Sequence, residues 1–316
     1  MNKQLVHFLV IQNSMVNFAT YNFKETNNMK KIIFSLLTVM LASTFAKADE
    51  GMWLPFLLNR NYEDMKKNGL QLTQEQLYSI NKASLKDAIV SLGGFCTGEL
   101  ISKESLMLTN HHCGYDAIRS NSTKEHDYLK NGFWAMDKKD EIPVPGLFAS
   151  FVVRIDDVTE KVLAELNDNM TETERNKKIS EISRKLSKEA SEGNDYKVFV
   201  RDFFEGNEFY MFTTEVFNDV RLVGAPPSSV GKYGGDTDNW MWPRHTGDFS
   251  MFRVYASKDG KPAAYAEENV PMTAKHHLPV SLKGVKPNDY AMVFGYPGST
   301  DRYLSSYGVQ LKMDTE

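Results

Sequence analysis

The sequence predicts a mainly β protein with helical excursions. Short runs rich in β-branched and aromatic residues recur along most of the chain and are separated by Gly- and Pro-rich segments. Two stretches, 53–92 and 157–192, instead show helical start signals or helical spacing. The strands and helices do not alternate as they do in a βαβ protein, and no internal repeat is present.

The composition is that of an ordinary globular protein. The 316 residues are 41% hydrophobic and 25% charged, which excludes disordered and collagen-like chains and allows a substantial core. The net charge is −4 (37 basic against 41 acidic residues), and residues 1–48 carry five Lys and one Glu of that total. The remainder is therefore at −8, the opposite of the balance typical of a duplex-binding protein, so nucleic acid is not expected as a partner.

The N-terminal region indicates export. A basic start at Met29-Lys30-Lys31 precedes an apolar stretch over 32–45, and Ala46-Lys47-Ala48 fits a cleavage site. The apolar stretch is too short to span a membrane, and a buried core helix is the alternative. We expect a signal peptide at 29–48, an over-extended gene start at 1–28, and a mature protein in the periplasm or at the cell surface.

Cys96 and Cys113 are the two cysteines of the chain. An oxidising compartment favours a disulfide between them, and two buried free thiols are the alternative. There is no Cys-x-x-Cys or His-Glu-x-x-His sequence, so neither a thioredoxin-type redox site nor a zinc protease is indicated.

The elements are expected in four parts. The first, 53–92, is expected to be helical, because Thr73 and Gln76 fit a capping box and apolar residues at 77, 80, 85 and 89 have helical spacing. Strands are expected at 95–100, 106–110 and 148–155. The charged segment 157–192 is expected to be helical, with a start signal at Thr171–Glu174 and a stop at Gly193. Strands return over 196–296, interrupted by a Pro- and Gly-rich stretch at 224–247.

The first chemical signal is the sequence Thr109-Asn-His-His-Cys113. A strand is expected to deliver a histidine directly before a cysteine, and such a position suits a general base that a local disulfide holds in place. Adjacent residues of an extended chain point to opposite faces, so only one of His111 and His112 is expected to face a cleft.

The second signal is the Gly-, Trp- and Asp-rich segment 231–249. A strand is expected from Phe249 to Tyr255, which places Asp248 at its start, where a carboxylate could orient a catalytic histidine. Asp residues beside glycines are also common as turn or cap residues, so Asp236, Asp238 and Asp248 keep that alternative interpretation.

Four motifs closely resemble the exported bacterial serine dipeptidyl-peptidases of types seven and eleven. They are Cys96-Thr-Gly98, Thr109-Asn-His-His-Cys113, the run from Gly235 to Phe249, and Phe294-Gly-Tyr-Pro-Gly298. Gly51-Met-Trp-Leu-Pro55 is similar to that family's mature start, so the likeness spans nearly all of 49–316.

The resemblance implies a chymotrypsin-like double β-barrel interrupted by an inserted helical domain, and a triad in the order His, Asp, Ser. It implies that His112 is the general base and that Asp248 orients it. Asn239 and Trp240 match positions that bind the free α-ammonium group of a peptide substrate, and Arg244 matches a neighbour that shapes the same pocket. For Trp242 we expect core packing. The resemblance also implies no cofactor and no metal, and a homodimeric full-length form.

The expected domains are a peptidase part at 49–300 that contains the first barrel, and the start of a helical domain at 301–316. Family members are about twice this long and carry the Ser nucleophile in their second half. No Gly-Asp-Ser-Gly or Gly-x-Ser-x-Gly motif occurs in this sequence, and Ser228, Ser229 and Ser299 are expected in loops or turns. The chain is therefore expected to be an N-terminal fragment that holds half of the site.

Two alternatives belong to other functional classes. The first is a non-catalytic secreted protein that keeps the pocket for a peptide amino terminus. The second is a metal site built from His111, His112, His245 and nearby carboxylates.

Overall fold

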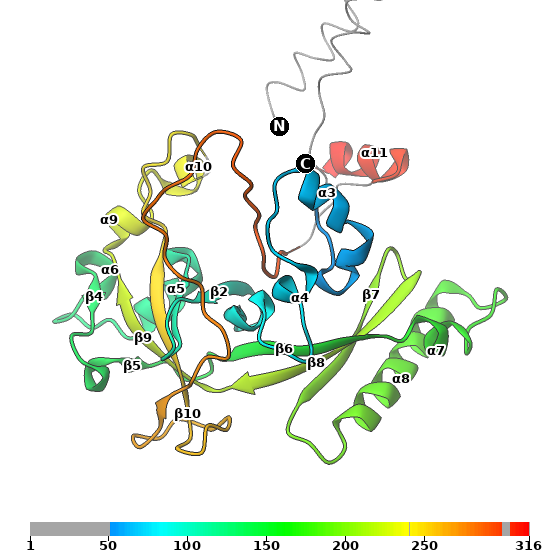
Figure 1. The fold of residues 1–316 in the computed structure, drawn as a ribbon, viewed down its shortest axis with the longest axis horizontal. Helices are drawn as coiled ribbons and strands as arrows, with labels where there is room; N and C mark the ends of the chain where they lie inside the picture. Colours follow the sequence, from blue (N-terminus) through cyan, green and yellow to red (C-terminus); the bar gives the residue numbers. More distant parts are fainter. Residues whose placement is uncertain (1–50, 240, 299–303, 316) are drawn as a thin grey trace, which may run out of the picture. The chain divides into compact units, whose positions relative to one another are not determined.

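The computed structural model describes residues 51–239, 241–298 and 304–315 (Figure 1). The described chain divides into a compact unit, Trp53–Gly298, and a second group of residues whose described helix is α11 (Ser306–Thr315). The expected gene start at 1–28 and the signal peptide at 29–48 lie outside the described residues. No described helix has the length and apolar character that a membrane span requires.

One antiparallel sheet organises the Trp53–Gly298 unit. Its strands follow the order β4-β9-β10-β3-β2-β1-β6-β8-β7, with β5 paired to β9 and β11 paired to β10. Their bounds are β1 Ile89–Leu92, β2 Cys96–Leu100, β3 Leu106–Thr109, β4 Phe133–Trp134, β5 Ile142–Pro143, β6 Ala149–Asp157, β7 Lys197–Phe203, β8 Glu208–Phe217, β9 Asp219–Ala225, β10 Ser250–Ala256 and β11 Val270–Pro271. A mainly β architecture with helices is confirmed, and no pairing among the described residues closes this sheet into a barrel.

The main core lies between β1, β2, β3, β9, β10 and helix α5 (His111–Ser120). Val90, Leu100, Leu222, Phe252 and Ile118 are fully buried there. The strands contribute alternate residues to this core, as a half-buried pleated sheet requires. The three strands expected before residue 156 are confirmed as β2, β3 and β6, each within one or two residues of its expected bounds.

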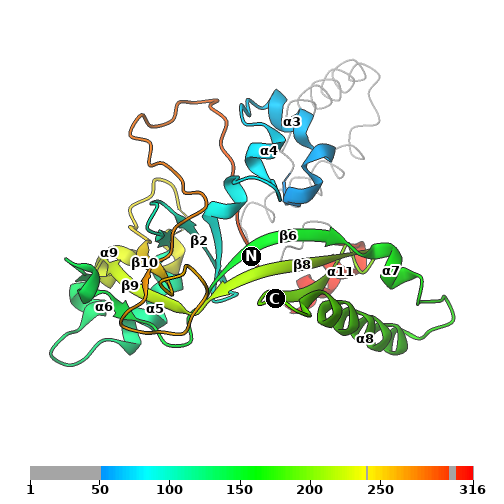
Figure 2. The same ribbon diagram turned by 60° about the horizontal axis from the view of Figure 1, so that its bottom comes forward.

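Strands β6, β8 and β7 extend beyond the main core and carry two helices, α7 (Thr159–Leu163) and α8 (Glu172–Ser191) (Figure 2). Helix α8 begins at the expected capping box, in which the Thr171 and Glu174 side chains each bond the other residue's backbone N–H. Ile182 of α8 packs with Phe209 and Met211 of β8 in a second, smaller core. The expected helical segment 157–192 is thus two helices that cover one face of this part of the sheet.

The segment 53–92 contains short helices and ends in a strand. It forms η1 (Pro55–Arg60), α3 (Tyr62–Lys67), α4 (Gln74–Leu77) and η2 (Leu85–Ala88) before β1 begins at Ile89. The capping box of Thr73 and Gln76 is confirmed at the start of α4. The prediction of a single apolar helical face was wrong. The chain turns between these helices and leaves Ile80 62% exposed, and Ile89 is buried within β1.

The later part of the unit departs from the expected run of strands. The Pro- and Gly-rich stretch contains two short helices, α9 at Ser228–Gly231 and α10 at Gly235–Asn239. Another short helix, α6 at Tyr128–Asn131, lies earlier in the chain. No strand is found over 272–298. Apolar residues there, such as Leu282 and Val293, have no neighbouring strand to pair with and are almost fully exposed.

Candidate active site

The pairing of β3 with β10 brings the two chemical motifs together. The two strands are antiparallel neighbours in the register Thr109↔Ser250, so the end of β3 and the start of β10 meet at one edge of the sheet. His112 follows β3 and Asp248 precedes β10, although 136 residues separate them in the sequence. The expected position of Asp248 at a strand start is confirmed.

Both histidines lie in the first turn of α5, which begins at His111 directly after the N-cap residue Asn110. The expectation of an extended chain at this point was wrong. The helix begins here because Asp248 accepts the His112 backbone N–H at 3.1 Å, which satisfies one of the free amide groups of a helix N-terminus. The two side chains still have different surroundings, since successive helical residues point about 100° apart.

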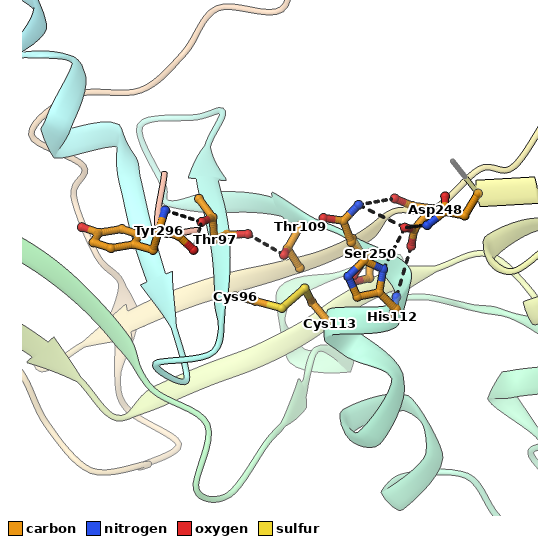
Figure 3. Close-up of a disulfide and its surroundings, with 10 residues drawn as sticks. Cys96, Thr97, Thr109, His112, Cys113, Asp248, Ser250 and Tyr296 are labelled. Carbon is orange, nitrogen blue, oxygen red and sulfur yellow. Dashed lines mark hydrogen bonds and ion pairs between the residues drawn. A yellow bond between two sulfur atoms is a disulfide. The ribbon is translucent and has the colours of Figure 1, made fainter. Parts of the chain in front are cut away.

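His112 and Asp248 form a hydrogen-bonded pair (Figure 3). The His112 Nδ1 atom lies 2.9 Å from Asp248 Oδ2, and the His112 side chain is 55% exposed whereas that of Asp248 is 9% exposed. Burial by itself raises the pKa of Asp248, but hydrogen bonds from His112, the histidine's charge and the Asn239 amide outweigh it and hold the pKa below its usual range. An ionised carboxylate only accepts, so Nδ1 carries the proton and Nε2 is left as a base.

His111 occupies a different environment. It is 1% exposed, its Nε2 lies 3.4 Å from the Ser228 hydroxyl, and its Nδ1 is buried without a hydrogen-bond partner. Helix α9 packs directly over its ring, because a Cβ atom built on Gly231 would lie 2.3 Å from the His111 Cγ. Burial therefore lowers the pKa of His111, against the opposing charge of Asp248. Its surroundings are those of a core residue.

Of the expected substrate-binding residues, Asn239 lies beside the same carboxylate and Arg244 lies beside Asn239. Asn239 donates from its side-chain amide to Asp248 Oδ2 at 3.1 Å, and Arg244 donates to the Asn239 backbone carbonyl. Trp240 lies outside the described residues. Trp242 is 86% exposed, so the expectation that it packs in the core was wrong. The structure places it on a short segment outside the sheet, where no described element covers it.

The Cys96–Cys113 disulfide is confirmed and joins β2 to the first turn of α5 (Figure 3). Ligand atoms of Cys96, Cys113 and His112 all lie within 4.8 Å of one another and make up the group of possible metal ligands found among the described residues. Both sulfurs are bonded to each other and the His112 Nδ1 faces Asp248, so this group does not suit a metal ion. His111, buried beneath α9, does not join it.

The Gly295–Gly298 turn is attached to β2 next to the disulfide. The Thr97 hydroxyl accepts the Tyr296 backbone N–H at 2.8 Å, and Thr109 Oγ1 donates to the Thr97 carbonyl at 2.7 Å (Figure 3). A side chain at Gly295 would collide with Thr97. The fourth sequence motif therefore lies next to the first two.

The chain belongs to the peptidase S46 family, whose profile matches residues 48–316. It is 55% identical over 284 residues to a dipeptidyl-peptidase 7 of Capnocytophaga gingivalis, covering 89% of this chain and 40% of that protein. It is 54% identical over 264 residues to an Asp/Glu-specific dipeptidyl-peptidase of Flavobacterium psychrophilum, covering 82% of this chain and 36% of that protein.

A solved structure also matches the fold. The crystal structure of Porphyromonas endodontalis DPP11 in complex with the dipeptide Arg-Asp superposes with a TM-score of 0.77 at 45% identity, covering 83% of this chain and 39% of that one. This chain thus spans about two fifths of the length of the relatives that it matches.

Two contacts of the site are not predicted from the sequence. Asn110 and Asn239 both donate to Asp248, at 3.1 Å each. Asn110 was read only as part of the histidine motif, and Asn239 only as a substrate contact. The sequence did offer a signal for the first contact. Asn110 stands between the predicted strand and the histidines, and a short asparagine side chain at such a position can bond to neighbouring groups.

Proposed function

We propose that this chain supplies the general base and its orienting carboxylate to a serine dipeptidyl-peptidase, which releases dipeptides from the free N-terminus of oligopeptides. The observation that carries the proposal is the His112–Asp248 pair, with its 2.9 Å contact and its exposed imidazole ring. Membership of the peptidase S46 family and the dipeptidyl-peptidases among its relatives support it.

In this mechanism His112 takes the proton of a serine hydroxyl through Nε2 as that oxygen attacks the substrate carbonyl. The resulting imidazolium is stabilised by Asp248, and the proton then passes to the leaving amino group of the shortened peptide. Water hydrolyses the acyl-enzyme with the same histidine as base. We propose that the serine and its oxyanion hole lie on polypeptide outside these 316 residues, since no nucleophile motif occurs within them.

The α-ammonium group of the substrate is proposed to bind beside Asp248. Because the Asn239 amide nitrogen faces Asp248, its Oδ1 atom points away from the carboxylate and can accept from an ammonium group. Arg244 donates to the backbone carbonyl of Asn239, and the resemblance implies that Trp240 contributes to binding the same ammonium group. Anchoring the amino terminus at a fixed distance from the nucleophile would set the product length at two residues.

Two further features belong to the same proposal. The sheet is proposed to be the first barrel of a chymotrypsin-like double barrel, supported by the order of the His and Asp residues and by the disulfide beside the histidine. Export is proposed from the segment at 29–48, and the disulfide supports an oxidising compartment.

The test is dipeptide release by the complete gene product, with peptides that carry a free amino terminus and with their N-acetylated counterparts. We expect release only from the free peptides, and about 10⁴-fold slower release by the His112→Ala variant. Equal cleavage of acetylated peptides would exclude the proposed amino-terminal pocket. Saturable binding of free peptides without any release would instead indicate the non-catalytic peptide-binding alternative.

A further inference from the structure

Four N–H donors converge on the carboxylate of Asp248. Oδ1 accepts the His112 backbone N–H at 3.1 Å, and Oδ2 accepts the His112 ring at 2.9 Å and the amides of Asn110 and Asn239 at 3.1 Å each. The two oxygens of a carboxylate offer about four acceptor positions. Oδ2 has two of these positions and receives three donors, whereas Oδ1 receives one, so protonating Oδ2 would remove a bond.

Asn110 lies at a helix N-terminus but does not make the hydrogen bond that is usual for an asparagine there. It is the N-cap of α5, and the side chain of an N-cap asparagine usually accepts a backbone N–H of the first helical turn. Here its side chain makes no such bond, because Asp248 Oδ1 already accepts the N–H of His112. The Asn110 amide is turned to Asp248 instead, and donates both to Oδ2 and to the main-chain carbonyl, at 3.3 Å.

The backbone of Asn110 is itself fixed. Its carbonyl accepts the Ser250 hydroxyl at 2.8 Å, one residue beyond the paired positions Thr109 and Ser250. The amide therefore extends from a rigid junction of two strands, and its two contacts with Asp248 restrain that residue's main chain and its side chain together.

We propose that Asn110 is a positioning residue for the active site: it holds the Asp248 carboxylate in the orientation that keeps His112 protonated on Nδ1 and leaves Nε2 free. The catalytic consequence rests on the proposed peptidase function. The structural consequence, an ordered His112–Asp248 hydrogen bond, does not depend on it.

The kinetic test uses the complete gene product. Asn110→Ala should lower kcat about tenfold, the scale of one lost hydrogen bond to a charged group, with KM changed less than twofold. The matched control is Asn121→Ala, which removes an asparagine from the other end of α5, where its amide donates to the Ala117 carbonyl at 2.8 Å. The control should keep its kcat.

A second pair of variants separates positioning from helix capping. Asn110→Ser retains a good N-cap residue but cannot donate as the amide does, so it should recover thermal stability and not kcat. Asn110→Asp has the same shape, lacks the donor and adds a negative charge beside Asp248, so its kcat should fall further than that of Asn110→Ala. Recovery of kcat in Asn110→Ser would show that the role is capping and would overturn the proposal.

A spectroscopic test works on the 316-residue chain whether or not it is active. The proton on His112 Nδ1 should give a far-downfield ¹H resonance, assigned by its absence in His112→Ala. It should persist in Asn121→Ala and broaden or vanish in Asn110→Ala. A resonance that behaves this way in a gene product without peptidase activity would refute the proposed function and leave the positioning role intact. The proposal would be overturned if Asn110→Ala left the resonance and kcat unchanged. It would also be overturned if Asn110→Ala and Asn121→Ala weakened the resonance and kcat equally.

Discussion

Removing the Cys96–Cys113 disulfide should destabilise the chain by a calculable amount. The bridge closes a loop of 17 residues, and in the chain-entropy model such a loop contributes about 3 kcal/mol at 25 °C by restricting the unfolded chain. For a unit of roughly 250 residues this corresponds to a fall in Tm of about 6–12 °C. The variant is Cys96→Ala combined with Cys113→Ala, which leaves no free thiol.

The assay is urea unfolding at constant pH, followed by tryptophan fluorescence and far-UV circular dichroism. The midpoint should fall in the double variant, and a reducing agent should lower that of the wild type to a similar value without changing that of the variant. A loss below about 1 kcal/mol, or a wild type indifferent to reducing agent, would refute the reasoning. Because the bridge anchors the first turn of α5, the downfield His112 resonance should also broaden in the variant.

Three further predictions concern the two histidines. In the complete gene product His112→Ala should lower kcat by about 10⁴-fold and His111→Ala far less, as single-substrate kinetics would show; similar losses would contradict the assignment of the base. Burial lowers the pKa of His111 in the folded chain, so the neutral ring stabilises the fold above pH 6.5 and this contribution is lost as the pH falls below that value. The free energy of unfolding in urea should therefore decrease toward pH 5.5, and it should decrease less steeply in His111→Gln. An identical slope in the variant would contradict this. Gly231→Ala should lower the free energy of unfolding by about 1–3 kcal/mol, because its methyl group would collide with the His111 ring. Gly298→Ala, which has open space around it, should lower it little. Equal shifts in Tm for the two variants would argue against the packing described.

The sequence was sufficient to predict much of the sheet and the residues of the His–Asp pair. Alternating apolar strands and a capping box are local patterns, and they predicted β2, β3, β6 and the start of α8 within a few residues. The bond between His112 and Asp248 itself depends on the pairing of β3 with β10, which no local pattern encodes. It was inferred through resemblance to a family.

The predictions that were wrong depended on tertiary contacts. Residues 110–112 were predicted to be extended, although Asn110 is a residue type that often begins a helix. The bond that caps this helix comes from Asp248, which is distant in the sequence. Ile89 has the right spacing for a helical face but joins the sheet through β2. The exposure of Trp242 could not be foreseen either, since the aromatic character of a residue predicts burial only where a neighbouring element covers it.

The separation of His112 and Asp248 along the chain has a kinetic consequence. A contact that closes a loop of more than a hundred residues forms late, because the entropy of ordering the intervening chain must be overcome before the contact contributes. Helix α8 and the strands it covers lie between them in the sequence and pack in a hydrophobic cluster of their own. A chain in which this cluster has folded before β10 docks against β3 would contain ordered helices and strands but no His112–Asp248 pair.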